Sequence, residues 1–108
     1  MNIYNWYKIE AITVEDLVDQ QMREVSIIEK HVGLLLKNGE LFAFSATCPH
    51  AGAKLCDGWL DAQGRIVCPL HKYRFDPKNG RNTSGEGYKL RTYPVEIREG
   101  YIYVGLQL

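Results

Sequence analysis

The sequence predicts an all-β protein built from short antiparallel strands. The segments between turn signals are short and rich in β-branched and aromatic residues, which disfavours long helices. The dipeptide Asn38-Gly39 lies between two apolar segments, and it is a strong hairpin signal because both residues tolerate positive φ. Near the C-terminus, apolar and polar residues alternate on both sides of Glu99-Gly100, which predicts a second hairpin.

The predicted elements follow in order along the chain. Thr13 is placed to cap one or two helical turns in TVEDLVDQQ, since threonine is a favoured N-cap. Val25 and Ile27 indicate the next strand, because apolar residues alternate there. Strands over residues 32–37 and 40–45 should then pair through the Asn-Gly turn.

The middle of the chain differs because its periodicity breaks down. Six glycines and three prolines accumulate between Phe44 and Pro94, which predicts a loop-rich insertion over about residues 46–90. A short strand around residues 65–67 should lead directly into Cys68. We find no internal repeat, and we expect a single domain over residues 1–108.

The composition excludes several classes of protein. A chain of 108 residues and 12.4 kDa can bury about two-thirds of its unfolded surface. Thirteen basic side chains balance thirteen acidic ones, so we expect neither nucleic acid nor an anionic membrane as partner. The first residues lack the pattern of a signal peptide, and the apolar runs are far shorter than the roughly 20 residues that span a bilayer. We therefore expect a cytoplasmic protein without a membrane anchor.

Two Cys/His pairs carry the chemistry. Cys48-x-His50 is followed after seventeen residues by Cys68-x-x-His71, so two thiolates and two imidazoles converge from two loops. Tetrahedral zinc accepts such a set, and a structural zinc module acting in protein binding is one alternative. Zinc-finger spacing, however, usually groups the cysteines in one knuckle and the histidines on one helix. Cys56 lies outside the ligand spacing, and we expect a plain buried or half-buried thiol.

The C-x-H…C-x-x-H spacing resembles the Rieske [2Fe–2S] family. The segments CPHAGAKLCDGWLDAQGRIVCPLHKYRFDPKNG and KLRTYPVEIREGYIYVGL look like the cluster region and closing strands of soluble Rieske ferredoxins. The resemblance implies a Rieske-type antiparallel β sandwich with a loop-rich cluster-binding subdomain. It also implies one [2Fe–2S] cluster per chain, with Cys48 and Cys68 on one iron and His50 and His71 on the other.

The residues around the second pair imply a low reduction potential. High-potential members of the family carry a serine and a tyrosine that donate hydroxyls to sulfur, where this chain has Tyr73 and Phe75. They also carry a loop-joining disulfide, where this chain has Leu70. We therefore expect a potential of about −150 to 0 mV. Lys72 stands where the family usually has glycine. It should strain that turn, or its charge should stabilise the reduced cluster or meet an acidic partner. The third loop, residues 82–89, lacks the usual proline and should be looser.

The histidine count limits the function. Rieske oxygenases also need a mononuclear iron held by two histidines and a carboxylate, and only His31 remains outside the Cys/His pairs. There is no G-x-G-x-x-G fingerprint for a flavin or nicotinamide. The resemblance thus implies a one-electron carrier rather than an enzyme. The first interpretation is a soluble Rieske-type ferredoxin between a flavin-dependent reductase and a terminal oxygenase, and the alternative is the small subunit of an assimilatory nitrite reductase.

The resemblance also suggests where redox partners dock. Imidazole edges should lie at the tips of the loops, and we expect Ala51, Leu55 and Leu70 to surround His50 and His71 as a partly apolar contact face. A further hypothesis is a basic rim beside the second loop, formed by Lys72, Arg74 and Lys78.

Overall fold

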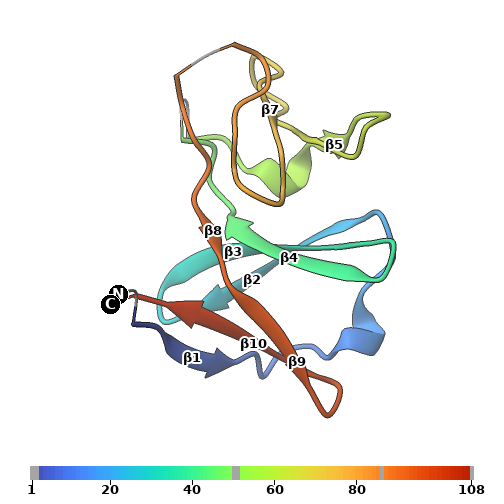
Figure 1. Ribbon diagram of the computed structural model, residues 1–108, viewed down its shortest axis with the longest axis vertical. Coiled ribbons are helices and arrows are strands. Elements are labelled where there is room, and N and C mark those ends of the chain that lie inside the picture. Colours follow the sequence, from blue (N-terminus) through green and yellow to red (C-terminus); the bar gives the residue numbers. More distant parts are fainter. Residues whose placement is uncertain (1–2, 50–51, 86, 108) are drawn as a thin grey trace.

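The fold is a β sandwich with a loop-rich lobe on one end (Figure 1). The computed structural model describes residues 3–49, 52–85 and 87–107. Within these ranges it contains ten strands and two 3₁₀-helices, and the longest helix is one turn. In chain order the elements are β1 (Asn5–Lys8), η1 (Val14–Asp16), β2 (Met22–Ile27), β3 (Lys30–Lys37), β4 (Glu40–Ser45), η2 (Leu55–Asp57), β5 (Trp59–Leu60), β6 (Ile66–Val67), β7 (Arg74–Phe75), β8 (Thr92–Tyr93), β9 (Val95–Arg98) and β10 (Tyr101–Leu106).

The strands form three antiparallel sheets. One has the order β1-β10-β9, and the middle sheet has the order β2-β3-β4-β8. The third, β5-β6-β7, belongs to the loop-rich lobe, residues 46–91, which lies between the end of β4 and the start of β8. The all-β prediction is confirmed. Across the described residues, no helix is long and apolar enough to cross a membrane.

The middle sheet is buried on both faces. Val32 and Leu34 point toward the first sheet and pack with Ile102 and Val104. Because side chains alternate along a strand, Leu35 points to the opposite face, where it joins the apolar cluster of the loop-rich lobe. Burial on both faces explains why β3 and β4 contain near-continuous apolar runs rather than alternation.

Both predicted hairpins are present. The turn residues Asn38 and Gly39 have φ values of 51° and 81°, and Glu99 and Gly100 have values of 52° and 83°. Two consecutive positive φ values are the geometry of the two-residue turn that matches strand twist. The strand predicted over residues 32–37 begins two residues earlier, at Lys30.

A third hairpin was not predicted from the sequence. It joins β2 to β3 through Ile28 and Glu29, whose φ values are 47° and 63°. A β-branched residue in this left-handed conformation costs roughly 1–2 kcal/mol, so neither residue signals a turn. The six paired positions of β2 and β3 hold the chain in register and impose the turn.

The predicted helix after Thr13 is shorter than expected. Only Val14–Asp16 forms a 3₁₀ turn, which begins where the Asp16 carboxylate accepts a 2.8 Å hydrogen bond from the Thr13 backbone N–H. The chain then becomes extended at Leu17. The Gln20 backbone N–H donates to the Leu36 carbonyl at 2.7 Å, so pairing with β3 takes the place of a second helical turn.

Candidate metal centre

Two loops of the lobe present the predicted ligands, and their backbones close in the same way. The Cys48 N–H donates to the Ala53 carbonyl at 2.8 Å, and the Cys68 N–H donates to the Tyr73 carbonyl at 2.9 Å. Each cysteine therefore begins a six-residue loop whose two ends are held together. His71 lies within the second loop, whereas His50 lies outside the described residues.

The two cysteine thiols lie together in an apolar environment. Cys48 and Cys68 are both buried and form no disulfide, and they share one apolar cluster with Leu55, Ile66 and Phe75. Burial raises the pKa of Cys68 to about 11; the Leu70 N–H donates to its sulfur and opposes the shift, while the hydrogen bond to Cys48 and the charge of that thiol add to it.

This donor set suits a positively charged metal group. Two adjacent buried thiolates repel each other and are poorly solvated, so they need a cation to balance their charge. Soft thiolates prefer zinc, Cu(I) or iron–sulfur clusters. Within the described part of the chain, which omits His50, no three potential ligands are gathered closely enough to hold an ion.

His71 lies at the exposed tip of the second loop. His71 and Lys72 have φ values of 66° and 58°, so the predicted strain at Lys72 is confirmed, and it costs on the order of 1 kcal/mol. The His71 ring lies 6.5 Å from the Tyr73 ring, and Tyr73 lies 6.0 Å from Tyr88 of the third loop. Aromatic contacts thus join the second and third loops beside the candidate ligand.

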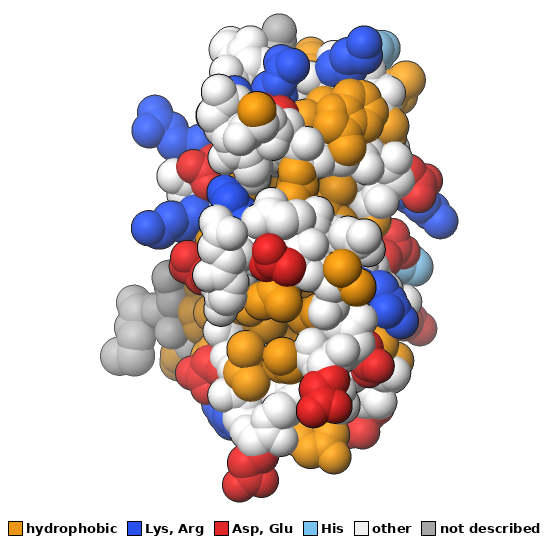
Figure 2. All heavy atoms as spheres, turned by 90° about the vertical axis from the view of Figure 1, so that its right-hand side faces the viewer, with side chains coloured by type: hydrophobic (Ala, Val, Ile, Leu, Met, Phe, Trp, Pro, Cys, Tyr) orange, Lys and Arg blue, Asp and Glu red, His pale blue; other side chains and the backbone are white. Residues whose placement is uncertain are grey.

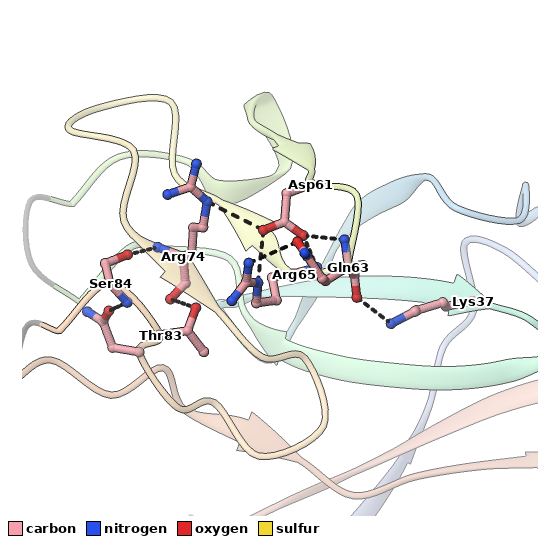
Figure 3. A network of polar contacts seen from close by, with 8 residues as sticks. Lys37, Asp61, Gln63, Arg65, Arg74, Thr83 and Ser84 are labelled. Carbon is pink, nitrogen blue, oxygen red and sulfur yellow. Dashed lines mark hydrogen bonds and ion pairs between the residues drawn. The ribbon is translucent and has the colours of Figure 1, made fainter.

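Hydrogen bonds hold the start of the third loop, residues 82–84, against β7 (Figure 3). The Arg74 N–H donates to Ser84 Oγ at 2.8 Å, and the Thr83 N–H donates to the Arg74 carbonyl at 2.8 Å. The Ser84 N–H in turn donates to Asn82 Oδ1 at 2.8 Å. These bonds restrain residues 82–84, and a looser loop over residues 82–89 stays a prediction.

A carboxylate joins the β5–β6 turn to β7 (Figure 3). Asp61 accepts hydrogen bonds from the Gln63 N–H at 3.0 Å and from the N–H and Nε of Arg65, both at 2.9 Å. Arg74 Nε lies 3.4 Å from the same carboxylate. Burial alone would raise the pKa of Asp61, but these hydrogen bonds and the charge of Arg65 outweigh it and lower the pKa. Lys37 Nζ donates to the Gln63 carbonyl at 3.4 Å, which attaches the turn to β3.

One glycine allows the segment after η2 to pack closely on β6. A Cβ atom at Gly58 would overlap the Val67 carbonyl oxygen, so a larger residue would separate the two segments. Val67 directly precedes Cys68. The glycine therefore lets the end of η2 lie against the strand that leads into the second loop, a close approach that the sequence suggested only as a cluster of turn residues.

The predicted contact face needs one correction. Leu55 is fully buried rather than exposed, because the 3₁₀ turn at Leu55–Asp57 directs it into the apolar cluster and its N–H donates to the Ala46 carbonyl at 2.8 Å. Leu70 is 45% exposed, as expected. Ala51 lies outside the described residues.

Cys56 is a half-buried free thiol, as predicted. Burial raises its pKa to about 12, and the negative charges of Glu24 and Asp57 add to the shift. The thiol therefore stays protonated near neutral pH, which fits a packing residue rather than a nucleophile.

Comparison with known proteins adds three findings. The model of the Rieske [2Fe–2S] domain matches residues 5–94. The ferredoxin component of the naphthalene 1,2-dioxygenase system of Pseudomonas putida is 31% identical over 99 residues, covering 91% of this chain and 94% of that protein. A chain of the solved complex of reduced oxygenase and oxidized ferredoxin in carbazole 1,9a-dioxygenase superimposes with a TM-score of 0.82 at 28% identity, covering 93% and 92%.

A fourth similarity concerns the fold alone. The solved structure described as a putative NADH-dependent nitrite reductase small subunit from Mycobacterium tuberculosis superimposes with a TM-score of 0.84 at 23% identity. The superposition covers 99% of this chain and 99% of that chain.

Proposed function

Because this chain belongs to the Rieske [2Fe–2S] family, we propose that it is a one-electron carrier whose cluster is held by Cys48, His50, Cys68 and His71. The observation that carries the assignment is the buried pair of thiols at the start of two matching loops. We also propose a single domain over residues 1–108, with residues 46–90 as the cluster-binding insertion.

The surrounding residues suit such a group. The bound cluster would accept and release one electron at low potential. Cys48 and Cys68 would lose their protons on binding, and the Leu70 N–H already donates to the Cys68 sulfur. His71 is exposed at the tip of its loop, so the histidine side would offer the shortest path to a partner. Leu55 and Phe75 would exclude water from the thiolate side.

We propose that the electron passes from a flavin-dependent reductase to a terminal oxygenase. The naphthalene dioxygenase relative is described as a ferredoxin component, and the carbazole dioxygenase structure is a complex of oxygenase and ferredoxin. With only His31 outside the Cys/His pairs, the chain lacks the histidines for a second, mononuclear iron site. It would therefore need a partner for any substrate chemistry.

The second candidate is the small subunit of an assimilatory nitrite reductase. The fold of this chain is about as similar to the Mycobacterium tuberculosis structure, with a TM-score of 0.84, as to the carbazole dioxygenase complex chain, with a TM-score of 0.82. Isolation of the chain in a stable complex with a sirohaem-containing large subunit would support this candidate. Electron transfer to an oxygenase without a stable complex would support the first.

We further propose that the protein works in the cytoplasm. Its three cysteines form no disulfide, although Cys48 and Cys68 lie close enough to interact. Thiols persist in this state in a reducing compartment. Fractionation of cells that express the protein, followed by immunoblotting, would test the location.

The decisive experiment is anaerobic purification with an iron and sulfide assay and an electron paramagnetic resonance spectrum. We expect a reddish-brown protein, whereas a structural zinc module would be colourless. His71→Ala and Cys68→Ser should lose the visible chromophore. His31→Ala is the matched control and should keep it, because the His31 side chain is exposed and its ring lies 3.1 Å from Glu24 rather than beside the cysteines. A chromophore that survives His71→Ala would contradict the ligand assignment.

A further inference from the structure

The neutral total charge conceals two oppositely charged lobes. Residues 46–91 contain eight Lys and Arg but four Asp and Glu, whereas the remaining residues contain five and nine. Figure 2 shows this separation: Lys and Arg prevail at the upper end, which is the loop-rich lobe, and Asp and Glu prevail at the lower end. The separation follows the longest axis of the molecule, which measures 38 Å.

Part of the positive charge is balanced within the lobe. Arg65 and Arg74 share the carboxylate of Asp61, at 2.9 and 3.4 Å. In the described part of the lobe these are the only ion pairs. Lys78 lines a groove with Glu40 and Asp76. Of the three residues expected to form a basic rim, Lys72, Arg74 and Lys78, Lys72 is the one that lies within the second loop, next to His71.

Two other lysines lie beside the candidate metal centre. Lys54 pairs across a β-bridge with Thr47, the residue before Cys48. Lys89 follows Tyr88, whose ring packs near Tyr73. Lys54, Lys72 and Lys89 are all exposed. Lys54 directly follows the first loop, Lys72 lies in the second and Lys89 ends the third. We call these residues the lysine triad.

The backbone at Lys72 adds a second observation. Its φ of 58° is a conformation that favours glycine or asparagine over lysine. A long cationic side chain is thus present next to His71 where the turn alone would favour a smaller residue. Strained positions of this kind concentrate at functional sites.

We propose that the loop-rich lobe is an electrostatic docking end for redox partners with an acidic contact surface, and that the lysine triad supplies the local attraction. This rests on the proposed electron-carrier function. Charges act over a Debye length of about 10 Å at 0.1 M salt, which is shorter than the distance between the two ends of the molecule. An approaching partner therefore experiences the nearer lobe rather than the net charge of zero. The dipole also turns the candidate metal centre toward an acidic surface before contact.

Small redox ions test the proposal without a known partner. Reduced holoprotein would transfer one electron to the anion hexacyanoferrate(III), giving hexacyanoferrate(II), or to the cation hexaamminecobalt(III), giving cobalt(II). Stopped-flow rates are measured from about 0.01 to 0.5 M ionic strength, where screening becomes strong. The rate with the anion should fall about tenfold or more as salt rises, and the rate with the cation should not fall. A neutral protein with evenly distributed charges would show no salt dependence with either ion.

Variants assign the effect to the lysine triad. The triple variant Lys54→Gln, Lys72→Gln, Lys89→Gln should lose most of the salt dependence with the anion. Arg23→Gln removes one positive charge from the exposed surface of β2 and should retain it. Lys72→Arg should also retain it. Lys72→Gly should lose the part of the salt dependence that Lys72 contributes, although glycine relieves the backbone strain of the turn. This variant therefore distinguishes the effect of the charge from the effect of the backbone conformation.

Ion-exchange chromatography gives a readout that does not depend on electron transfer. At pH 7 the protein lies near its isoelectric point of about 6.8, yet the basic lobe should retain it on a cation exchanger, and the triple variant should elute earlier. Coloured protein that is not retained, or whose reaction with hexacyanoferrate(III) is independent of salt, would overturn this proposal alone. Colourless protein would overturn the electron-carrier function and this proposal together.

Discussion

Replacing Gly33 with alanine tests whether the middle sheet supports the loop-rich lobe. Gly33 in β3 lies opposite Phe44 in β4, and the Phe44 ring covers it. A Cβ atom at position 33 would overlap Cε2 and Cζ of that ring and would lie 2.9 Å from Cδ2. The ring would have to move by about 1 Å to reach the ~3.5 Å of ordinary carbon–carbon contact. Phe44 has no exposed surface and packs in the same apolar cluster as Cys48 and Cys68, so the displacement reaches the candidate metal centre.

The expected cost follows from this geometry. Overpacking a full core costs about 1–3 kcal/mol, and 1 kcal/mol corresponds to roughly 4–8 °C of melting temperature for a domain of this size. We therefore expect Gly33→Ala to melt at least about 4 °C below the parent protein. Thermal scans of the holoprotein should follow circular dichroism and visible absorption together, at one fixed rate, because loss of the cluster would make unfolding irreversible.

Two further variants make the test specific. Gly87→Ala is the control, because no described atom lies within 4 Å of its added Cβ and its φ is not left-handed. Phe44→Leu in the Gly33→Ala background should recover part of the loss, so that the double variant costs less than the sum of the two single ones. If Gly33→Ala melts with the parent protein and with Gly87→Ala, the close packing of Phe44 on β3 is wrong.

Three other predictions concern the lobe. Cys56 should resist iodoacetamide at pH 8 in the folded holoprotein, because burial raises its pKa to about 12; mass spectrometry showing rapid alkylation without unfolding would contradict this. Asp61→Asn should lower the free energy of unfolding at pH 7 by roughly 1–2 kcal/mol, since the carboxylate accepts charge-assisted hydrogen bonds. The folded pKa of Asp61 lies below the ordinary aspartate value of 3.8. This contribution is therefore complete well above pH 3.8 and is lost as the pH falls through the folded pKa. Urea titrations should show the two proteins converging in acid, and a constant difference would argue against the carboxylate. Phe75→Tyr should raise the reduction potential if its hydroxyl reaches a cysteine sulfur, because Phe75 is fully buried in the cluster that contains both thiols. A net hydrogen bond of about 1 kcal/mol corresponds to roughly 40 mV for one electron, and an unchanged or lower value in a redox titration would refute this placement.

The strands and the two Gly-containing hairpins could be predicted from the sequence because their signals are local. Asn38-Gly39 and Glu99-Gly100 specify positive φ through the residues themselves. The fully apolar run of β3 was harder to interpret, since alternation is absent when both faces of a sheet are buried. Only the folded chain shows that Leu34 faces one sheet and Leu35 faces the lobe.

The elements that were missed depend on distant partners. Ile28-Glu29 turns because β2 and β3 pair on either side of it, not because either residue favours a turn. Leu55 was expected at the surface because it lies in a loop beside the cysteines, whereas its 3₁₀ turn buries it. The bonds from Asp61 to Arg65 and Arg74 could not be foreseen, because many carboxylates in the sequence had the same chance of finding these partners.

The sequence by itself determined the all-β class and the spacing of the two Cys/His pairs, because turn propensity and ligand spacing are properties of neighbouring residues. The tertiary structure decided which cysteines meet, which side chains are buried and how charge is distributed. Thirteen positive and thirteen negative side chains are compatible with many arrangements. Only the packing of residues 46–91 at one end of the sandwich converts a neutral chain into a molecule with one basic and one acidic end.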